Sequence, residues 1–306
     1  MLLKFAIKEF LDDREFKNLS PVTIVGYKSF LEIFLEYCTR NEIIDIDEIT
    51  ASTVKGFLLE AKNVKGNNPV TINTKLKNLK AFFNYLEYEE IITEKNNPAK
   101  RIPYGKTEIK IEVFTDNQIA QMLNYYRRLK YRDKSFYSYR DYMIIVFLLG
   151  TGVRVGELVN LRWKDADLEN CILTVFGKKR EYSSIPISEK LKKELREYKI
   201  FCEKEFNNNL EYVFTDKDNK QMTDNAVKNM FKRLKVIMNF KDVRLSAHTF
   251  RHTFANRCLL NGMDVFTLQK MLRHKNLSMT ERYLALWGTA LRDQNEKFNP
   301  LNDLNI

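Results

Sequence analysis

Helix start signals followed by apolar residues at helical spacing recur through most of this chain. Ser20 is a suitable N-cap directly before a proline, and Thr50 and Pro69 open two further segments. Each segment continues with apolar residues on one face, as in the run 72–86. With a shorter helix near residues 3–13, this pattern predicts a small domain of four helices.

The stretch 96–110 separates this domain from the rest of the chain. It has no clean periodicity and contains Pro103 and Gly105, as expected of a linker. A T-x-x-Q capping box at Thr115, preceded by a phenylalanine, then opens a second domain. We therefore predict a mainly α chain with two domains and a linker between them: 1–104, 105–111 and 112–306.

The second domain combines helices with a small antiparallel sheet. Residues 171–176 and 182–187 are the only convincing strands, and a turn over 177–180 joins them. Residues 139–149 form an apolar helix that should be buried. The aromatic and basic run 125–142 is interpreted as an amphipathic helix followed by a solvated loop that touches phosphates. Further helices are predicted at or after Arg154, Thr223, Ser246, Gly262 and Ser278. Gly262 is expected to be a cap, and Ser278 begins an S-x-x-E capping box.

The distribution of charge indicates a polyanionic partner. Residues 1–105 contain 15 Lys and Arg and 15 Asp and Glu, so the net charge of +11 belongs to the remainder. Residues 225–257 hold eight Lys and Arg against Asp242 alone, and residues 61–81 hold five lysines without an acid. Solvated surface is the simpler explanation for any single lysine. One-sided runs in both domains nevertheless predict two surfaces that face DNA.

Several classes of protein are disfavoured. Acidic residues at Glu9 and Asp12 come too early for a secretory signal, and the uncharged stretch 143–153 is too short to span a bilayer. The four cysteines include no C-x-x-C pair, so we expect reduced thiols, no disulfide framework and no zinc site. These features predict a cytoplasmic protein without a membrane partner.

Six residues suggest chemistry on a phosphodiester. Guanidinium groups match phosphate oxygens with paired donors, and a tyrosine hydroxyl is a nucleophile that can hold a DNA end covalently. His248 and Arg251 are three residues apart on a predicted helix, so both face one spot. An H-x-x-R sequence alone would more simply be a surface histidine, but two of the chain's three histidines belong to this set. The candidate catalytic residues are Arg154, Lys178, His248, Arg251, His274 and Tyr283.

The sequences around these residues resemble tyrosine recombinases of the phage-integrase superfamily, closest in layout to the short Xer-type members. The matching strings are GTGVRVGELVNLRW, FGKKREYSSIPI, SAHTFRHTFA, LRHKNLSMT and TERYLAL. The intervals of 24, 70, 3, 23 and 9 residues keep the order and spacing typical of the family. The N-terminal helices resemble its core-binding domain, so the resemblance covers nearly the whole chain.

The resemblance implies a fold, an activity and partners. The fold would be a four-helix SAM-like core-binding domain followed by a mostly helical catalytic domain with a small antiparallel sheet. The activity would be site-specific recombination of double-stranded DNA through a 3′-phosphotyrosyl intermediate and a Holliday junction, without metal, cofactor or ATP. Four copies, or copies with a paralogous recombinase, would hold two DNA sites in the bacterial cytoplasm at the nucleoid. The purpose would be integration and excision, inversion or dimer resolution.

Chemical reasoning gives each candidate a role. Arg154 and Arg251 would clamp the phosphate, and His274 would donate a further hydrogen bond to it. His248 is the candidate general base toward Tyr283. The leaving 5′ oxygen needs a proton, for which Lys178 is the candidate general acid.

Departures from the family pattern leave some assignments open. Arg273 stands where the family usually has glycine, and Lys179 stands beside Lys178, so either lysine is a candidate acid. Glu157 and His252 are interpreted as structural, with Glu157 orienting Arg154. After the tyrosine, Leu284, Trp287 and Leu291 share one helical face, which would pack either on their own domain or on a neighbouring protomer.

Two other functions compete with the recombinase hypothesis. A type IB topoisomerase shares the covalent chemistry but relaxes supercoils as a monomer, and the Xer-like N-terminal domain disfavours it. A DNA-binding architectural protein with an inactive site is disfavoured because all six residues are retained.

Overall fold

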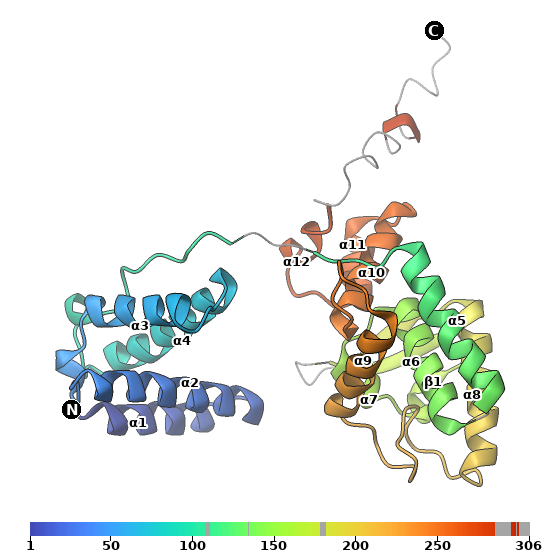
Figure 1. Cartoon of the computed structure of the whole chain (residues 1–306), viewed down its shortest axis with the longest axis horizontal. Helices are drawn as coiled ribbons and strands as arrows, with labels where there is room; N and C mark the ends of the chain where they lie inside the picture. Colours follow the sequence, from blue (N-terminus) through green and yellow to red (C-terminus); the bar gives the residue numbers. More distant parts are fainter. Residues whose placement is uncertain (108–110, 134, 178–181, 285–294, 298, 300–306) are drawn as a thin grey trace. The chain divides into compact units, whose positions relative to one another are not determined.

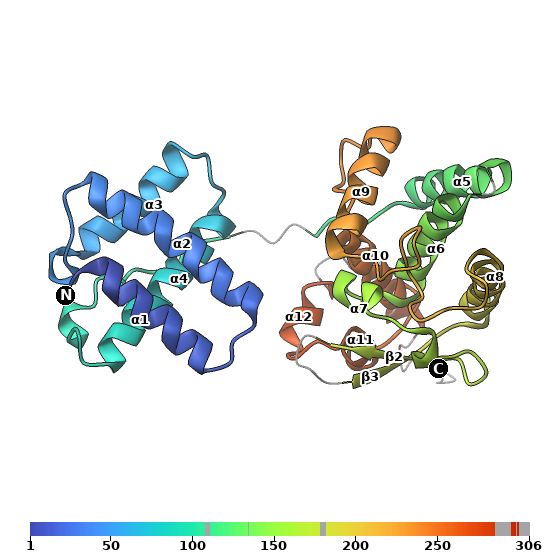
Figure 2. The same ribbon diagram turned by 90° about the horizontal axis from the view of Figure 1, so that it is seen from below.

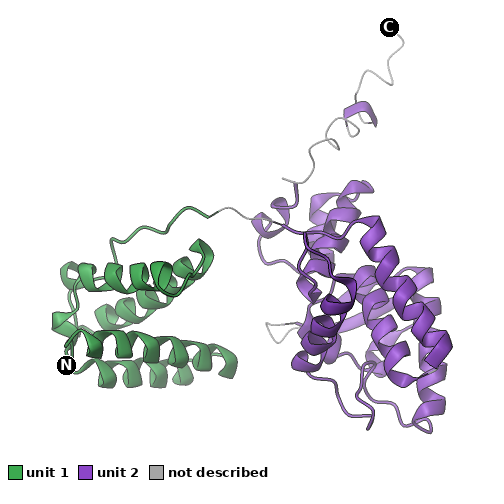
Figure 3. Cartoon of the chain, viewed as in Figure 1, with its two compact units in different colours: residues 1–108 green, residues 109–306 purple. Residues whose placement is uncertain are grey.

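The computed structural model describes residues 1–107, 111–133, 135–177, 182–284, 295–297 and 299. The chain divides into two compact units, residues 1–108 and 109–306 (Figure 3). The linker predicted at 105–111 includes this division. Each unit has its own hydrophobic core, so each is described by itself.

The first unit is a bundle of four helices, which confirms the predicted fold class for this part (Figure 1). Ser20 caps the second helix by accepting from the backbone N–H of Thr23, and Thr50 caps the third in the same way through Thr53. Aromatic side chains fill the interior, where Phe10 contacts Phe82 edge-to-face at a centroid distance of 5.6 Å. The helices are α1 (Leu3–Phe16), α2 (Pro21–Arg40), α3 (Ala51–Asn63) and α4 (Pro69–Tyr88), with 3₁₀ turns at Ile46–Glu48 and Glu94–Asn96.

The second unit is built around one apolar helix, α6 (Phe136–Thr151), which packs against α5, α8 and α10 (Figure 2). Most of its side chains are buried, as predicted for residues 139–149. The capping box at Thr115 is confirmed, because its hydroxyl accepts from the backbone N–H of Gln118 and its own N–H donates to the Gln118 side chain. The other helices are α5 (Asp116–Asp133), α7 (Val155–Val159), α8 (Glu189–Glu205), α9 (Asp224–Met238), α10 (Ala247–Leu260), α11 (Val265–Leu272) and α12 (Ser278–Glu281), with a 3₁₀ turn at Trp163–Asp165.

The sheet of the second unit has three antiparallel strands in the order β1-β2-β3. The strands are β1 (Ala166–Asp167), β2 (Ile172–Phe176) and β3 (Tyr182–Pro186). Leu173 pairs with Ile185, and both are buried because alternate residues of the hairpin face the core. The hairpin was expected, whereas β1 and the helix α8 lie outside the prediction.

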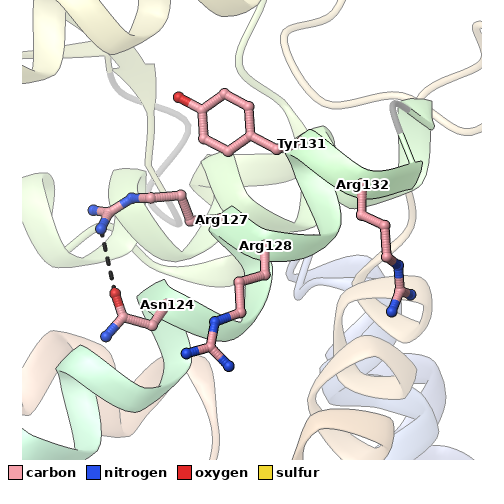
Figure 4. Close-up of a pocket in the computed structure, with 5 residues that line it drawn as sticks. All are labelled: Asn124, Arg127, Arg128, Tyr131 and Arg132. Atoms are coloured by element: carbon pink, nitrogen blue, oxygen red, sulfur yellow. Dashed lines mark hydrogen bonds between the residues drawn. The ribbon is translucent and has the colours of Figure 1, made fainter.

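Three local predictions are corrected. In the described part of the run 125–142, α5 extends to Asp133 and α6 begins at Phe136, so the residues that were expected in a solvated loop are mostly helical. Arg127 and Arg128 lie on α5 and help to line a surface pocket (Figure 4), whereas Arg140 of the same run lies on α6. Asp264, not Gly262, caps α11. Ser278 is the first residue of α12 and caps nothing.

Among the helices that the structure describes, none combines the length and apolar composition of a membrane span.

Candidate active site

Arg154 directly precedes α7, after a sharp turn at the end of α6. Gly152 ends α6 in the left-handed conformation with φ of 59°, which glycine adopts without steric strain. A Cβ atom at this position would lie 2.5 Å from Cδ1 of Phe254 on α10, so close packing also requires glycine here. The turn therefore fixes the position from which the Arg154 side chain extends.

Glu157 binds Arg154 through its backbone and its side chain. The backbone N–H of Arg154 donates to Oε2 of Glu157 at 2.8 Å, and Nη1 of Arg154 donates to Oε1 at 2.8 Å. Nη2 of Arg273 donates to Oε2 at 2.6 Å. Burial alone would raise the pKa of Glu157, but Arg273 and these hydrogen bonds hold that pKa below its ordinary value. Such a buried, ionised carboxylate fits the orienting role predicted for Glu157.

Arg251 is buried on α10 and is held by two backbone carbonyl groups. Its Nη1 donates to the Gly152 oxygen at 2.7 Å, and its Nη2 donates to the Leu272 oxygen. Burial, followed by the charges of Arg154 and Arg273, lowers the pKa of Arg251 to about 9, so the guanidinium remains charged at neutral pH. The end of α11 thus holds both arginines, because Nη2 of Arg154 donates to the next carbonyl oxygen, that of Arg273, at 3.4 Å.

His274 follows the end of α11 and is 8% exposed. Its Nδ1 shares a 2.8 Å hydrogen bond with the hydroxyl of Thr280 on α12. Burial, together with Arg251 and Arg154, lowers the pKa of His274 to about 3, so the ring is neutral at physiological pH. With the Thr280 hydroxyl as donor, Nε2 carries the ring proton and can donate it to an oxygen.

Tyr283 is buried in a small core formed by α10, α11 and the segment after α12. Its hydroxyl shares a 2.8 Å hydrogen bond with Nδ1 of His252, and its ring lies parallel to that of His274 at a centroid distance of 6.5 Å. Burial raises the pKa of Tyr283, and the charges of Arg282, Arg251 and Arg154 partly oppose this effect. The phenol therefore stays protonated in this resting arrangement.

His252, which sequence reasoning treated as structural, is the residue that contacts the tyrosine hydroxyl. Burial and the nearby cation Arg282 lower its pKa to about 4, so the neutral ring can accept the Tyr283 proton in a hydrogen bond. The signal was present in the sequence, because His252 is four residues from His248 and therefore shares its helix face.

His248 lies on the first turn of α10 and is exposed. Its ring centroid is 6.3 Å from that of His252. Partial burial, followed by Arg251 and Arg154, lowers its pKa. The structure shows no hydrogen bond between His248 and Tyr283, so the role of His248 as general base stays a prediction.

Five of the six predicted residues are described, and Lys178 lies outside the described residues, as does Lys179. The described β strands end at Phe176 and resume at Tyr182, on either side of these lysines. The C-terminal residues Trp287 and Leu291 are also outside the described ranges. In the part of the chain that is described, no group of three or more His, Cys, Asp and Glu side chains is arranged to hold a metal ion.

These residues define a class of site. Two charged guanidiniums, fixed by carbonyl groups and a carboxylate, lie next to a neutral imidazole and within electrostatic reach of a tyrosine. Cationic donors of this kind stabilise charge on a phosphoryl group, and the phenol supplies a nucleophile. This combination of groups is compatible with phosphoryl transfer to a tyrosine.

Comparisons of the sequence with known proteins identify one family. The Phage integrase family matches residues 112–287, and the description "Phage integrase, N-terminal SAM-like domain" matches residues 7–93. Tyrosine recombinase XerC of Thermodesulfovibrio yellowstonii is 27% identical over 98% of this chain and 97% of its own length. Tyrosine recombinase XerD of Oceanobacillus iheyensis is 26% identical over 98% of this chain and 99% of its own length.

The fold is also similar to that of solved structures. The Tn1549 transposon integrase in complex with transposon right end DNA matches with a TM-score of 0.75 at 24% identity, over 92% of this chain and 94% of that chain. The present chain belongs to the phage integrase family, the tyrosine recombinases.

Proposed function

We propose that this protein is a site-specific DNA recombinase in which Tyr283 attacks a DNA phosphodiester. The observation that carries the proposal is the placement of the Tyr283 phenol beside His274 and within electrostatic reach of Arg154 and Arg251. No other grouping of charged side chains in the described residues combines a tyrosine with two carbonyl-held guanidiniums. This combination suits phosphoryl transfer to a tyrosine, because the guanidiniums stabilise charge on the phosphoryl group and the phenol is the nucleophile.

Arg154 and Arg251 would bind the non-bridging oxygens of the phosphate. A guanidinium has five N–H donors. Each of these two side chains donates to two protein acceptors, so further donors remain for the substrate. Because the acceptors are carbonyl groups and a buried carboxylate, the donors are oriented before DNA arrives. Little reorganisation is then required when charge develops in the transition state.

His274 would add one more donor. Its contact with Thr280 fixes the ring, and the neutral tautomer with the proton on Nε2 donates to an oxygen without requiring protonation of the ring. This use of a neutral imidazole suits a site in which nearby cations already oppose a further positive charge.

The nucleophile must lose its proton and become accessible. Tyr283 is fully buried in the free chain, so we expect it to leave the small core around α11 when DNA binds. Its proton would pass to an imidazole on α10, for which His248 and His252 are the candidates. The Tyr283 oxygen then forms a bond to phosphorus while the bond from phosphorus to the 5′ oxygen breaks.

The departing 5′ oxygen takes up a proton from a general acid, which we assign to Lys178 or Lys179 from the sequence. The product is a 3′-phosphotyrosyl bond and a free 5′ hydroxyl. Attack of a 5′ hydroxyl from another strand on this bond reverses the chemistry and completes the exchange without a net change in the number of phosphodiester bonds.

Recombination requires contacts with DNA and between protomers. The lysine-rich segment 61–81 and the basic segment 225–257 are the proposed DNA-facing surfaces, the first on the N-terminal unit and the second over α9 and α10. We propose that four protomers assemble on two sites, either as one species or with a paralogue. The mass of the complex on DNA, measured by analytical ultracentrifugation, tests this part.

Covalent capture tests the nucleophile directly. A pool of nicked duplexes of varied sequence is incubated with the protein, and adducts that survive detergent are isolated and sequenced. We expect wild-type protein to form adducts with a free 5′ hydroxyl, Tyr283→Phe to form none, and Tyr88→Phe, which alters an exposed tyrosine, to match wild type. Adducts formed by Tyr283→Phe would refute the assignment.

The choice between the two lysines has its own test. In a substrate with sulfur in place of the leaving 5′ oxygen, the sulfur departs as a thiolate. Its departure needs no general acid. The variant that lacks the acid, Lys178→Ala or Lys179→Ala, should cleave ordinary DNA slowly and this substrate at the wild-type rate. If neither variant shows this difference, both lysines are excluded as the acid.

A further inference from the structure

Arg273 occupies a position that is unusual for a long side chain. It ends α11 in the left-handed region with φ of 55°, where a residue with a Cβ atom is strained. Its backbone N–H nevertheless closes the helix by donating to the Lys270 oxygen at 3.0 Å. A residue that tolerates such strain in a site is a candidate for a specific role.

The Arg273 side chain points into the protein and not toward solvent. It is 11% exposed, and Nη2 and Nε donate to Glu157 at 2.6 and 3.4 Å. Nη1 donates to the Met271 oxygen at 2.6 Å. Three of its five N–H donors are therefore used on protein oxygens, and the low exposure of the side chain argues against a direct contact with DNA.

Arg273 is connected to Arg154 in two ways. Its carboxylate partner Glu157 also binds the Arg154 guanidinium, and its own carbonyl oxygen accepts from Nη2 of Arg154. The preceding carbonyl, that of Leu272, accepts from Arg251. The left-handed turn at Arg273 therefore sets the direction of the carbonyl that holds Arg154, while the side chain balances the charge of Glu157.

The balance of charge matters most when the substrate is bound. Glu157 is 3% exposed, and a buried carboxylate without a cation is strongly destabilising. Arg154 is 29% exposed and has to direct donors toward a phosphate. If Arg154 were the only cation beside Glu157, the carboxylate and the phosphate would compete for it. Arg273 removes this competition because it remains on Glu157.

We propose that Arg273 is a positioning residue for strand cleavage: it acts as the permanent counter-ion of Glu157 and so leaves Arg154 available for the DNA phosphate. This inference rests on the proposed recombinase function. It assigns to Arg273 a role in the rate of cleavage and not in the binding of DNA.

The test compares two substitutions at left-handed helix ends. Arg273→Gly removes the ion pair and relieves the backbone strain, whereas Asn207→Gly relieves the same kind of strain just after the end of α8, where φ is 52°, outside the site and both proposed DNA-facing surfaces. On DNA recovered from wild-type adducts, we expect Arg273→Gly to lower the single-turnover cleavage rate by about 10- to 100-fold, as for a displaced catalytic group. DNA affinity should stay near that of wild type, whereas thermal stability should fall because a buried ion pair is lost, with the protein still folded at the assay temperature. Asn207→Gly should cleave at the wild-type rate.

Glu157→Gln identifies the mechanism. In the wild-type background it should slow cleavage, because Arg154 loses its anchor. In the Arg273→Gly background it removes the competing charge, so the double variant should cleave no more slowly than Arg273→Gly alone. Two losses that multiply would overturn the proposal, since they would mean independent roles.

Arg273→Lys guards against loss of folding as the explanation. It keeps the positive charge, so it should cleave faster than Arg273→Gly. A wild-type rate for Arg273→Gly, or equal rates for Arg273→Gly and Arg273→Lys below that of wild type, would overturn the proposal. If wild-type protein forms no adduct at all, the recombinase function itself fails, which is a separate result.

Discussion

The hydroxyl group of Tyr283 lies 2.8 Å from Nδ1 of His252, and the tyrosine side chain is fully buried in a small core. The imidazole is neutral because burial and Arg282 lower its pKa to about 4. A phenol donor and a neutral imidazole acceptor satisfy each other, so the tyrosine can be buried without an unpaired hydroxyl. In the free chain the proposed nucleophile, Tyr283, is therefore buried and hydrogen-bonded to a potential proton acceptor, His252.

The hydrogen bond between Tyr283 and His252 should make the effects of substitutions at the two residues on the free energy of unfolding non-additive. His252→Leu leaves the Tyr283 hydroxyl buried without its partner, and we expect it to destabilise the second unit by about 1–3 kcal/mol. Adding Tyr283→Phe should then cause less further loss than in wild type, with a coupling free energy of about 1 kcal/mol. Urea unfolding of the four proteins measures it, with His252→Asn as the control that keeps a polar partner. Strictly additive losses would contradict the bond.

Stability should fall with acid over a defined range of pH. The pKa of His274 is lowered to about 3 and that of His252 to about 4, against 6.5 for an ordinary histidine. The unfolded chain therefore takes up protons below pH 6.5 while the folded chain resists, so stability is complete above pH 6.5 and is lost as the pH falls toward 4. The loss from these rings should be on the order of 2 kcal/mol or more.

Thermal unfolding at several pH values measures this loss. Carboxylates also contribute to acid unfolding, so the comparison is with His252→Asn, which cannot titrate in this range. Its stability should depend less steeply on pH between 6.5 and 4. An identical slope for both proteins would show that His252 is not held neutral.

Two glycines at the Arg154 turn should respond in opposite ways. Gly152→Ala places a Cβ atom 2.5 Å from Phe254 at a φ of 59°, and we expect a loss of at least about 2 kcal/mol. Gly156→Ala adds a methyl group with no atom within 4 Å, inside α7, and should be neutral or stabilising by up to about 1 kcal/mol. Chemical unfolding distinguishes the two, and comparable losses would contradict the tight turn.

The hydroxyl of Thr280 should matter for catalysis because it orients His274. Thr280→Val has nearly the same shape but removes the 2.8 Å hydrogen bond to Nδ1. We expect cleavage to slow by about tenfold, equivalent to about 1.4 kcal/mol in the barrier. Thr280→Ser retains the hydroxyl and should stay close to wild type. Wild-type cleavage by Thr280→Val would mean that the ring is held by packing alone.

Sequence patterns were informative wherever the signal is local. The caps at Ser20, Thr50 and Thr115 were predictable because a side chain bonds the backbone three residues away. The strand β1 was not predictable, because a strand of two residues carries no period, even though its partners in β2 are only five and seven residues away. For α8, Leu191 and Leu195 have helical spacing among many charges, and their burial against α6 makes that spacing meaningful.

In the site, the chemistry of the side chains was predictable and their partners were not. The guanidiniums, imidazoles and phenol could be listed from their types and spacing. That His252 contacts Tyr283, or that Arg273 shares Glu157 with Arg154, depends on segments more than 30 residues apart in the first case and more than 100 in the second. No local pattern encodes such distances.

The order of residues therefore determined most of the helices, several of their caps, the hairpin and the set of groups available for phosphoryl transfer, since each follows from contacts within a few positions. Only the tertiary structure decided which imidazole holds the tyrosine, which carbonyl groups orient the arginines and where a strained arginine is used. The reason is physical: hydrogen bonds and buried charges depend on distances in space, and packing of α10, α11 and the turn at Gly152 sets those distances.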